Sequence, residues 1–409
     1  MVLILLIFSI SANGQKTEKK TVINTVDFPN ISGPIQLTDK PYEHFFASYY
    51  GINSFSANEH FATVLRTTIK DHLPNENEPA TLGIVDLRNK SFIPITKTHA
   101  WNFQQGCMAH WLSTNPDSLI IYNDLREGKF VSVILNVHTK KEKKVIPYPI
   151  SAVSPNGKEV ISINFSRLRA TRDSYGYGGN GQESKIKKVY PKDDGLFLIN
   201  LENGVAKLIV SLFDIKKYVP EIKENSIAYF NHTLFSRKGS KIFWLSRAKP
   251  IGLNTTAFTV DRIGTNLKAC FPNGWGGSHF DWLNDEELMV SAKYNKKMYG
   301  HIIFDVNKKN YKRLGKGLLD YDGHGTFSPN EKWMVTDTYP KNEMKEQKIY
   351  LMDMKTEAVI SLGRFQNHPA YKKDWRCDIH CRWSPSGKII GFNSTHNGTR
   401  QIYIFKLNQ

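Results

Sequence analysis

Short apolar runs, each bounded by polar turn residues, recur along the whole chain. Runs such as SLIIYND, KIFWLSR and KIIGFNS have the β-branched and aromatic content that is typical of strands. No long stretch shows the helical spacing of apolar positions, in which they return every three or four residues. The pattern therefore predicts an all-β protein built from many short strands.

The strand pattern repeats around one kind of turn. The clearest copy is WSPSGK, which begins at Trp383; Ser-Pro favours a turn there, and Gly387 supplies a positive φ. Similar turns recur at intervals of 56, 42, 82, 47, 45 and 56 residues, near the period of propeller blades except for the third. The residues that mark them are Phe55, Trp111, Val153, Phe235, Trp282, Phe327 and Trp383. Seven copies of an antiparallel unit predict a seven-bladed β-propeller in one domain over residues 41–409, rather than a β-sandwich or two smaller β domains.

Three segments fall outside the repeat. Residues 1–14, MVLILLIFSISANG, resemble a secretory signal peptide, which predicts export to the periplasm or the outside; a buried N-terminal strand is the alternative. Residues 15–40 are polar, and we expect them to run along the surface and to add a closing strand to the last blade. The longest interval holds a Gly-rich, basic insertion at residues 167–194, which we expect to be a functional loop.

Charge narrows the class of partner. The chain carries 55 Lys and Arg against 38 Asp and Glu, a formal charge of +17, which attracts polyanions. No basic helix or nucleic-acid motif is present, and no later run is long enough to cross a bilayer. We therefore expect an acidic polysaccharide or oligosaccharide as partner, no nucleic acid, no membrane span and a monomer. Four cysteines are too few for a disulfide scaffold of this size.

Histidines occupy one position of the repeat. The residues three places before the seven marks are Ile52, Met108, Ile150, His232, His279, His324 and His380. This position lies near the start of the innermost strand of a blade, so we expect the four imidazoles to face one mouth of the central channel. Imidazoles that converge suit a divalent metal such as Mn²⁺, Zn²⁺ or Ca²⁺, or acid–base catalysis. A further ligand would come from Cys377, Asp378 or Gln366, although Cys377 is equally consistent with a core thiol.

Other candidate residues lie on the remaining blades and in the insertion. They are Gln105, His110, Arg167, Arg172, Tyr175, Tyr177, Tyr339 and Arg376. Arginine forks bind carboxylates, and His or Tyr can exchange a proton with a sugar. These are the parts needed for β-elimination at a uronate, where a proton is removed next to a carboxylate whose charge must be neutralised. Hydrolysis would more naturally use a pair of carboxylates, and none stands at the channel position.

Several motifs resemble those of a known group of enzymes. SHFDW (Ser278–Trp282), DGHGTFSPNEKWMVTDTYP (Asp322–Pro340) and WRCDIHCRWSPSGK are similar to motifs of the seven-bladed propeller polysaccharide lyases, which include the oligogalacturonate lyases and, more loosely, the ulvan lyases. The resemblance covers most of the chain after about residue 40.

The resemblance implies roles for particular residues. In oligogalacturonate lyases, histidines and a glutamine of the late blades hold a metal that binds the substrate carboxylate; His279 and His380 match these motifs. The first residue of that family's His-x-His pattern is Asp378 here, and no matching glutamine is evident. The ulvan lyases are similar in using an early His, a following Tyr and an Arg, an order that His110, Tyr175 and either Arg167 or Arg172 match.

These observations predict an exported polysaccharide lyase that cleaves a uronic-acid glycan of the pectic or ulvan type. His110 or His232 would be the base and Tyr175 the acid, while an arginine and a metal at His279, His324 and His380 neutralise the carboxylate. One alternative is a non-catalytic propeller, like those of translocation-associated proteins, that binds protein or glycan. A second alternative is a hydrolase that uses a metal-activated water.

Overall fold

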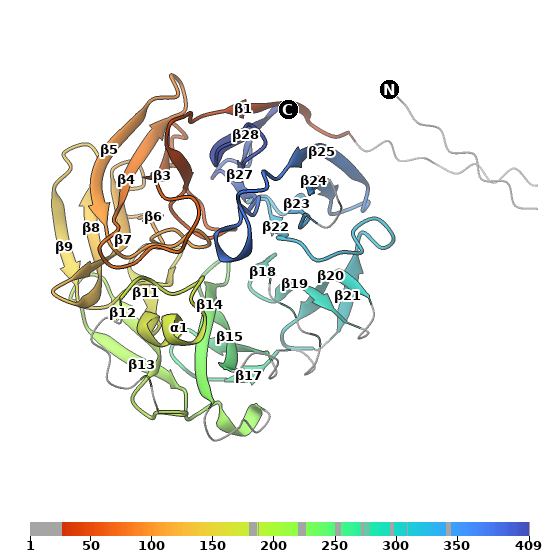
Figure 1. Cartoon of the computed structure of the whole chain (residues 1–409). Coiled ribbons are helices and arrows are strands. Elements are labelled where there is room, and N and C mark those ends of the chain that lie inside the picture. Colours follow the sequence, from red (N-terminus) through yellow and green to blue (C-terminus); the bar gives the residue numbers. More distant parts are fainter. Residues whose placement is uncertain are drawn as a thin grey trace, which may run out of the picture.

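The computed structural model describes residues 27–179, 186, 188–219, 226–249, 255–270, 275, 277, 279–294, 298–308, 310–340 and 345–408. The described residues form seven antiparallel sheets of four strands each, arranged around a central axis as a seven-bladed β-propeller (Figure 1). The predicted fold class, all-β with one propeller domain, is confirmed. The proposed signal peptide, residues 1–14, lies outside the described residues.

The strands follow the chain from the inner to the outer edge of each blade. The first three blades contain β2 (Glu43–Phe46), β3 (Phe61–Thr67), β4 (Ala80–Asp86) and β5 (Phe92–Thr98); β6 (His110–Trp111), β7 (Leu119–Arg126), β8 (Lys129–Asn136) and β9 (Glu142–Ile146); and β10 (Ala152–Val153), β11 (Glu159–Ser162), β12 (Gly195–Asn200) and β13 (Ala206–Ser211). Blades four and five contain β14 (Ile227–Phe235), β15 (Lys241–Lys249), β16 (Thr256–Asp261) and β17 (Lys268–Ala269); and β18 (His279–Trp282), β19 (Glu287–Lys293), β20 (Tyr299–Asp305) and β21 (Tyr311–Leu314).

Blade six contains β22 (Thr326–Phe327), β23 (Trp333–Asp337), β24 (Glu346–Asp353) and β25 (Val359–Gln366). Blade seven contains β26 (Arg382–Trp383), β27 (Ile389–Ser394) and β28 (Gln401–Asn408), and its outer strand is β1 (Asn30–Gln36), which pairs with β28. One sheet thus joins the two ends of the described chain and closes the ring, so the propeller begins before residue 41. Two short 3₁₀ turns span Lys216–Tyr218 and Lys373–Trp375.

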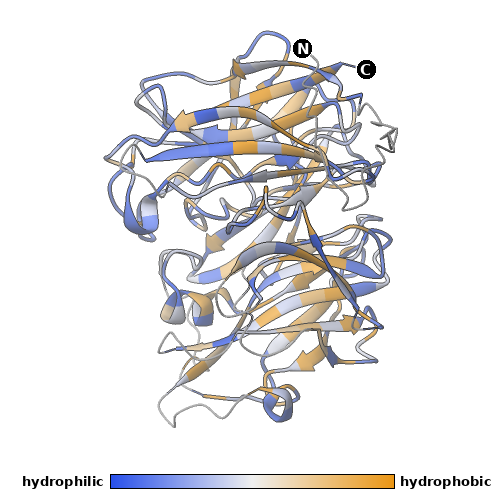
Figure 2. Cartoon of the chain, turned by 90° about the vertical axis from the view of Figure 1, so that its right-hand side faces the viewer, coloured by the Kyte–Doolittle hydropathy of each residue, from blue (hydrophilic) through white to orange (hydrophobic). Residues whose placement is uncertain are grey.

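The core lies between neighbouring blades. Figure 2 shows hydrophobic residues along the strands and hydrophilic residues concentrated toward the turns. Phe243 of blade four and Phe280 of blade five pack with ring centroids 4.3 Å apart in one such layer, which also contains Trp282. Two of the three tryptophans that mark the repeat also link blades by hydrogen bonds. Trp383 donates a hydrogen bond from its indole nitrogen to the carbonyl of Thr326 at 3.1 Å, and Trp111 donates one to the carbonyl of Ser54 at 2.9 Å.

The insertion of the third blade lies between β11 and β12 and is not wholly a loop. Its start forms α1 (Phe165–Thr171), where the side chain of Asn164 accepts a hydrogen bond from the backbone N–H of Arg167 and caps the first turn. The apolar spacing of Phe165 and Leu168, both buried, is too short to stand out as a helix in the sequence. The helix lies near the central channel (Figure 1), and this position brings the residues after it to the channel mouth.

Candidate functional site

Blade one inserts a loop into the central channel. Its inner strand β2 stops at Phe46, which pairs with Val64, and pairing resumes where Phe55 bridges Ala62. Residues 47–54, which we call the channel loop, therefore leave the sheet. Arg382 of β26 is buried and donates from Nη1 to the carbonyl and the hydroxyl of Ser48, both at 3.1 Å, and to the hydroxyl of Ser54 at 2.9 Å. The last blade thus clamps both ends of the loop.

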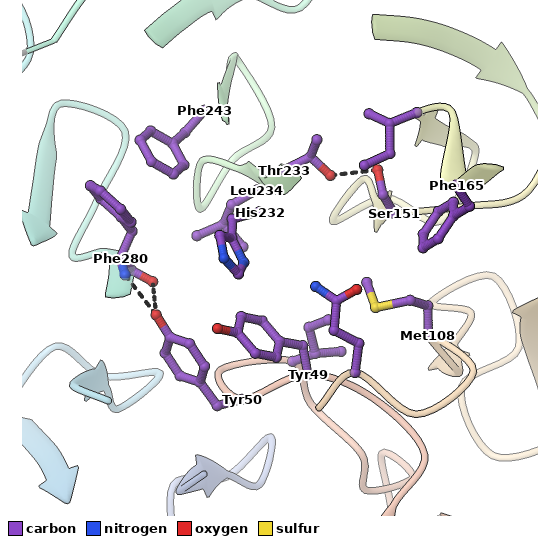
Figure 3. Close-up of a pocket in the computed structure, with 13 residues that line it drawn as sticks. Tyr49, Tyr50, Met108, Ser151, Phe165, His232, Thr233, Leu234, Phe243 and Phe280 are labelled. Atoms are coloured by element: carbon purple, nitrogen blue, oxygen red, sulfur yellow. Dashed lines mark hydrogen bonds between the residues drawn. The ribbon is translucent and has the colours of Figure 1, made fainter. Parts of the chain in front are cut away.

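The channel loop carries Tyr49 and Tyr50 to the axis. The hydroxyl of Tyr50 accepts a hydrogen bond from the backbone N–H of Phe280 at 2.6 Å and donates one to its carbonyl at 3.2 Å (Figure 3). The ring of Tyr50 lies 4.9 Å from that of His324, and the ring of Tyr49 stacks on His232 at 5.1 Å, both measured between centroids. Two tyrosines therefore divide the channel between His232 on one side and the other histidines on the other.

Three of the four histidines form a compact group at one side of the axis. The ring centroids of His279 and His324 are 4.1 Å apart, and those of His324 and His380 are 4.4 Å apart. All three side chains are buried. His279 begins β18, while His324 and His380 each stand two residues before the inner strand of blade six and blade seven. The repeat therefore delivers the three imidazoles from adjacent blades to one place, which we call the histidine group.

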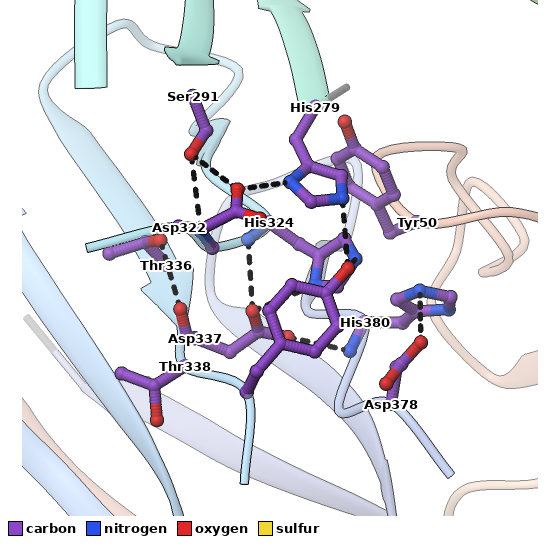
Figure 4. A network of polar contacts seen from close by, with 12 residues as sticks. Tyr50, His279, Ser291, Asp322, His324, Thr336, Asp337, Thr338, Asp378 and His380 are labelled. Carbon is purple, nitrogen blue, oxygen red and sulfur yellow. Dashed lines mark hydrogen bonds and ion pairs between the residues drawn. The ribbon is translucent and has the colours of Figure 1, made fainter. Parts of the chain in front are cut away.

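Two carboxylates, the buried Asp337 and the partly buried Asp322, orient the histidine group (Figure 4). Asp322 lies 3.0 Å from Nδ1 of His279, and Asp337 lies 2.8 Å from Nδ1 of His324. Asp337 also accepts hydrogen bonds from the backbone N–H groups of His324 and His380, both at 2.9 Å. A carboxylate at Nδ1 fixes the ring and leaves the lone pair of Nε2 directed into the site.

Burial and neighbouring charges shift the pKa values of the three histidines in different directions. Burial lowers the pKa of His279 and, much further, that of His380, and the neighbouring His324 acts in the same direction. Burial also opposes protonation of His324, but Asp337 and Asp378 outweigh it and raise its pKa. Burial likewise opposes ionisation of Asp322, but His279 outweighs it and the pKa of this carboxyl falls to about 2. The pKa values of the neighbouring His279 and His324 therefore shift in opposite directions.

The same residues fit a divalent metal. His324, Asp378 and His380 offer ligand atoms that all lie within 4.8 Å of one another. Among the described residues, no hydrogen bond reaches Nε2 of His380 or the outer oxygen of Asp378, although both atoms are buried and 3.8 Å apart. Buried polar atoms left without partners are costly, and a cation would satisfy both of them. Nitrogen and oxygen donors together suit Mn²⁺ or Zn²⁺.

His232 forms the other half of the site. The ring of Tyr175 meets it edge-on at 5.1 Å, and the guanidinium of Arg172 lies 4.6 Å above the ring of Tyr175. Burial, followed by the charges of Arg247 and Arg172, lowers the pKa of His232 far below its usual value, so the imidazole is neutral. A cavity of about 40 Å³ lies beside it, with Tyr49, Tyr50 and Phe280 among its lining residues (Figure 3).

Arg376 and Tyr339 border the histidine group. Arg376 donates from Nε to Asp378 at 2.9 Å, and its guanidinium lies 5.7 Å from the ring centroid of Tyr339. The hydroxyl of Tyr339 is 3.0 Å from Nε2 of His279 and 3.2 Å from Nε2 of His324.

Two candidates from the insertion have structural partners instead. Arg167 is buried, pairs with Asp194 at 2.9 Å and donates to the carbonyls of Lys188 and Ala228. It fastens α1 to blade four, so of the two arginines considered only Arg172 reaches the site. Tyr177 is buried as well: its ring stacks on Phe165 at 4.5 Å, and its hydroxyl accepts a hydrogen bond from Asn123 at 2.8 Å. It therefore belongs to the core and not to a substrate surface.

Three further candidates lie apart from the histidine group. Burial lowers the pKa of His110 to about 4, and within the described part of the chain its ring contacts neither the histidine group nor Tyr175. Gln105 lines the small cavity beside His232. Cys377 is buried, which raises the pKa of its thiol to about 11, and the set of clustered ligand atoms among the described residues contains Asp378 in its place. All four cysteines are free and buried.

Several site residues were not expected from the sequence. Tyr49 and Tyr50 belong to an insertion that has no counterpart in the other blades, so the repeat assigned Ile52 to this position. Arg247 lies on β15, a second strand, which the repeat did not single out. Asp322 and Asp337 lie within the DGHGTFSPNEKWMVTDTYP motif, and a carboxylate two residues before a candidate ligand was the signal available for Asp322.

Similar folds occur among solved structures. Oligogalacturonate lyase from Vibrio parahaemolyticus superposes with a TM-score of 0.66 at 10% identity, covering 93% of this chain and 98% of that one. An oligogalacturonate lyase in complex with manganese gives a TM-score of 0.67 at 13% identity, covering 94% and 95%. A prolyl endopeptidase gives 0.55 at 7% identity, covering 89% of this chain and 47% of that one.

These likenesses show the propeller fold alone, and they support the oligogalacturonate lyase part of the resemblance but not the ulvan lyase part. A protein-family model matches residues 114–223, well short of half of the chain. None of the curated proteins matches the chain in sequence. No helix among the described residues is long and apolar enough to cross a membrane.

Proposed function

We propose that the chain is a lyase that cleaves a uronic-acid oligosaccharide or polysaccharide of the pectic type by β-elimination. The observation that carries the proposal is the meeting, at one channel mouth, of a carboxylate-oriented histidine group with a neutral histidine flanked by Tyr175 and Arg172. The likeness to oligogalacturonate lyases, one of them a manganese complex, supports the same chemistry.

Charge neutralisation is the first requirement of the reaction. The proton to be removed is bonded to the carbon next to the uronate carboxylate. As this proton leaves, negative charge develops on the carboxylate. Arg172 and Arg376 present guanidinium groups from two sides of the site and suit a carboxylate. His279, His324, Asp378 and His380 would hold a divalent cation, which when bound acts as a Lewis acid on the carboxylate.

Proton transfer is the second requirement. We assign the base to His232, because it is neutral, partly buried and directed into the space shared with Tyr49 and Tyr175. We assign the return of a proton to the departing sugar oxygen to Tyr175, whose ring meets that of His232 edge-on at 5.1 Å. His110 lies apart from this set, so of the two base candidates the geometry favours His232. General acid–base catalysis of this kind contributes about 10²–10⁴-fold.

The localisation in this proposal rests on the sequence, and one alternative function is weighed against it. We propose export to the periplasm or the outside because of the apolar stretch at residues 1–14. The non-catalytic alternative, a propeller that binds glycan or protein, would explain the basic charge, but it requires neither a neutral His232 nor oriented imidazoles.

The test is the ultraviolet absorbance of the unsaturated uronyl product during incubation with pectic, ulvan and glycosaminoglycan substrates, with and without a chelator. We expect turnover on a pectic substrate, a fall of about 10²–10⁴-fold in His232→Gln, and little change in His138→Gln. His138 is the matched control, because it is exposed, follows β8 in the outer part of blade two, and contacts the carbonyl of Asp117 and the ring of Phe61. Absence of signal on every uronate polymer would refute the lyase proposal.

A further inference from the structure

A larger cavity lies between blades two and three, at the start of α1. Its volume is about 390 Å³, within the range of about 300–1,000 Å³ that is usual for ligand sites. Ile163 and Phe165 line both this cavity and the smaller one beside His232, so the two spaces are neighbours (Phe165 is labelled in Figure 3). We call the larger space the blade cavity; its lining residues include Lys129, Tyr148, Ser162, Ser166, Asp194 and Phe197.

Strand direction places the blade cavity at the channel mouth that carries the histidines. The first strand of a blade starts at this mouth, because His279 is the first residue of β18. Antiparallel pairing returns the end of the second strand and the start of the third to the same mouth. Ser162 ends β11, Gly195 begins β12, and residues 147–149 follow the end of β9. From there α1 leads to Arg172, a distance of about 10 Å for seven helical residues.

Part of the lining of the blade cavity is aromatic. Tyr148 and Phe197 are both partly exposed, and their ring centroids lie 5.9 Å apart at an interplanar angle of 34°. Pro147 and Pro149 flank Tyr148 and line the cavity with it. The C–H groups on one face of a sugar ring pack flat against aromatic rings of this kind. These residues therefore suit a pyranose.

Polar groups with spare hydrogen-bonding capacity line another part. Asp194 is buried, and the hydrogen bonds that it accepts from Nε of Arg167 and Nδ2 of Asn164, at 2.9 Å each, both end on Oδ2. Its other oxygen, Oδ1, makes no hydrogen bond within the described part of the chain, and neither do the hydroxyls of the buried Ser162 and Ser166. Buried polar groups normally have partners, and the hydroxyl groups of a sugar would supply them here.

The charges of the blade cavity do not suit a second uronate. Lys129 is the one cation among the described residues that line it, and it is exposed. Two carboxylates, those of Asp193 and Asp194, line the same space, and the guanidinium that pairs with Asp194 belongs to the buried Arg167. A uronate placed here would bring a third negative charge toward these two aspartates. The lining therefore favours a sugar without a carboxylate.

We propose that the blade cavity binds an uncharged pyranose residue of the glycan whose uronate is cleaved at the channel mouth. This inference deepens the proposed function and rests on it, because the occupant belongs to the same glycan. It narrows the substrate class to glycans in which uncharged sugars accompany the uronates, within the chain or as branches. The positive charge of the protein attracts acidic polymers in general, and the blade cavity selects among them.

Methyl glycosides test the inference without any cleavage, because they contain no bond between two sugars. The uncharged probes are the methyl pyranosides of galactose, rhamnose and xylose. The charged probe is methyl galactopyranosiduronate, which differs from the galactose probe only by its carboxylate. NMR titrations measure the affinity of each probe for the unaltered protein and for its variants. Tyr311→Ala is the matched control for Tyr148→Ala, because Tyr311 is an exposed tyrosine on β21 of blade five, outside the cavity.

We expect at least one uncharged probe to bind, with an affinity about tenfold lower in Tyr148→Ala and unchanged in Tyr311→Ala. Ser166→Ala removes one hydroxyl and leaves the aromatic residues in place, so it should lower this affinity about 2–10-fold, even if Tyr148→Ala fails to fold. The inference is overturned if no uncharged probe binds, or if its affinity is the same in both of these variants.

The charged probe supplies a further discriminating result. We expect any binding of methyl galactopyranosiduronate to be unaffected by Tyr148→Ala, because this probe would bind at the channel mouth. Binding of the charged probe that depends on Tyr148 as strongly as binding of the uncharged probe would show that the cavity accepts uronates, and this would overturn the inference as well. The turnover test of the lyase proposal is independent, because failure to bind these probes leaves cleavage of a uronate polymer measurable.

Discussion

Asp337 links the histidines of blades six and seven, and Asp337→Asn is the substitution that perturbs this link most directly. Both carboxylate oxygens accept hydrogen bonds only from N–H groups: the backbone and Nδ1 of His324 on one oxygen, and the backbone of His380 on the other. The side chain is 1% exposed, so water cannot replace a lost partner. Asparagine has the same shape but offers one acceptor oxygen and one NH₂ group that only donates.

The magnitude follows from this geometry. Whichever way the amide of Asp337→Asn turns, its NH₂ group faces at least one N–H of His324 or His380. A hydrogen bond to a charged acceptor contributes about 1.5–3 kcal/mol, and a buried donor left unpaired costs about 1–3 kcal/mol. We expect the free energy of unfolding to fall by about 3 kcal/mol. Cation affinity should fall about 10–100-fold, because Nδ1 of His324 can then accept a hydrogen bond from the amide NH₂, which places the imidazole proton on Nε2, directed at the cation.

Asp322→Asn is the matched control. The single oxygen Oδ1 of Asp322 accepts from both Nδ1 of His279, at 3.0 Å, and the hydroxyl of Ser291, at 2.9 Å, so an amide oxygen can keep both hydrogen bonds. We expect it to lose about 1 kcal/mol or less. Urea unfolding measures the stability of both variants, and chelator competition measures their cation affinity. Wild-type stability and cation affinity in Asp337→Asn would refute the role assigned to this carboxylate.

Three further outcomes are expected. Arg172→Gln should lower kcat/KM on a uronate substrate about 10–100-fold, because one hydrogen bond to a charged group is lost. An unchanged kcat/KM would show that Arg172 does not bind the substrate carboxylate. Arg382→Met should lower the free energy of unfolding by about 2–3 kcal/mol in urea, because the channel loop loses all three hydrogen bonds from this guanidinium. Burial lowers the pKa of His44, His110 and His301 to about 4 from the usual 6.5, so these side chains are neutral in the folded protein at neutral pH. Stability should therefore be constant above pH 6.5 with respect to these groups and fall as the pH drops from 6.5 toward 4, by up to about 1.4 kcal/mol per pH unit for each histidine. His301→Asn should make this slope shallower, and an identical slope would contradict the assignment.

The repeat made the fold and part of the site readable from the sequence. WSPSGK at Trp383 and its weaker copies marked the blades, because the turn and the tryptophan are demanded locally by every blade. The positions of His279, His324 and His380 followed from the same register. A repeat of this kind predicts only what all blades share.

What the repeat could not predict are features that occur once. The channel loop displaces the register of blade one, so Tyr49 and Tyr50 had no pattern to reveal them. Arg167 and Arg172 are five residues apart in a segment expected to be a loop, and only the formation of α1 sends one to Asp194 and the other to the site. Cys377 and Asp378 are adjacent in sequence, and the local backbone decides which of them faces His380.

The most direct test of the proposed β-elimination is whether oxygen from water enters the cleavage products. A pectic oligosaccharide of defined length is incubated with the protein in water enriched in heavy oxygen, and the fragments are weighed by mass spectrometry. β-Elimination transfers no oxygen from water, so the combined mass of the fragments should equal that of the substrate, with no heavy oxygen in either. One heavy oxygen per cleaved bond would show that the site activates water, and the lyase account would be wrong.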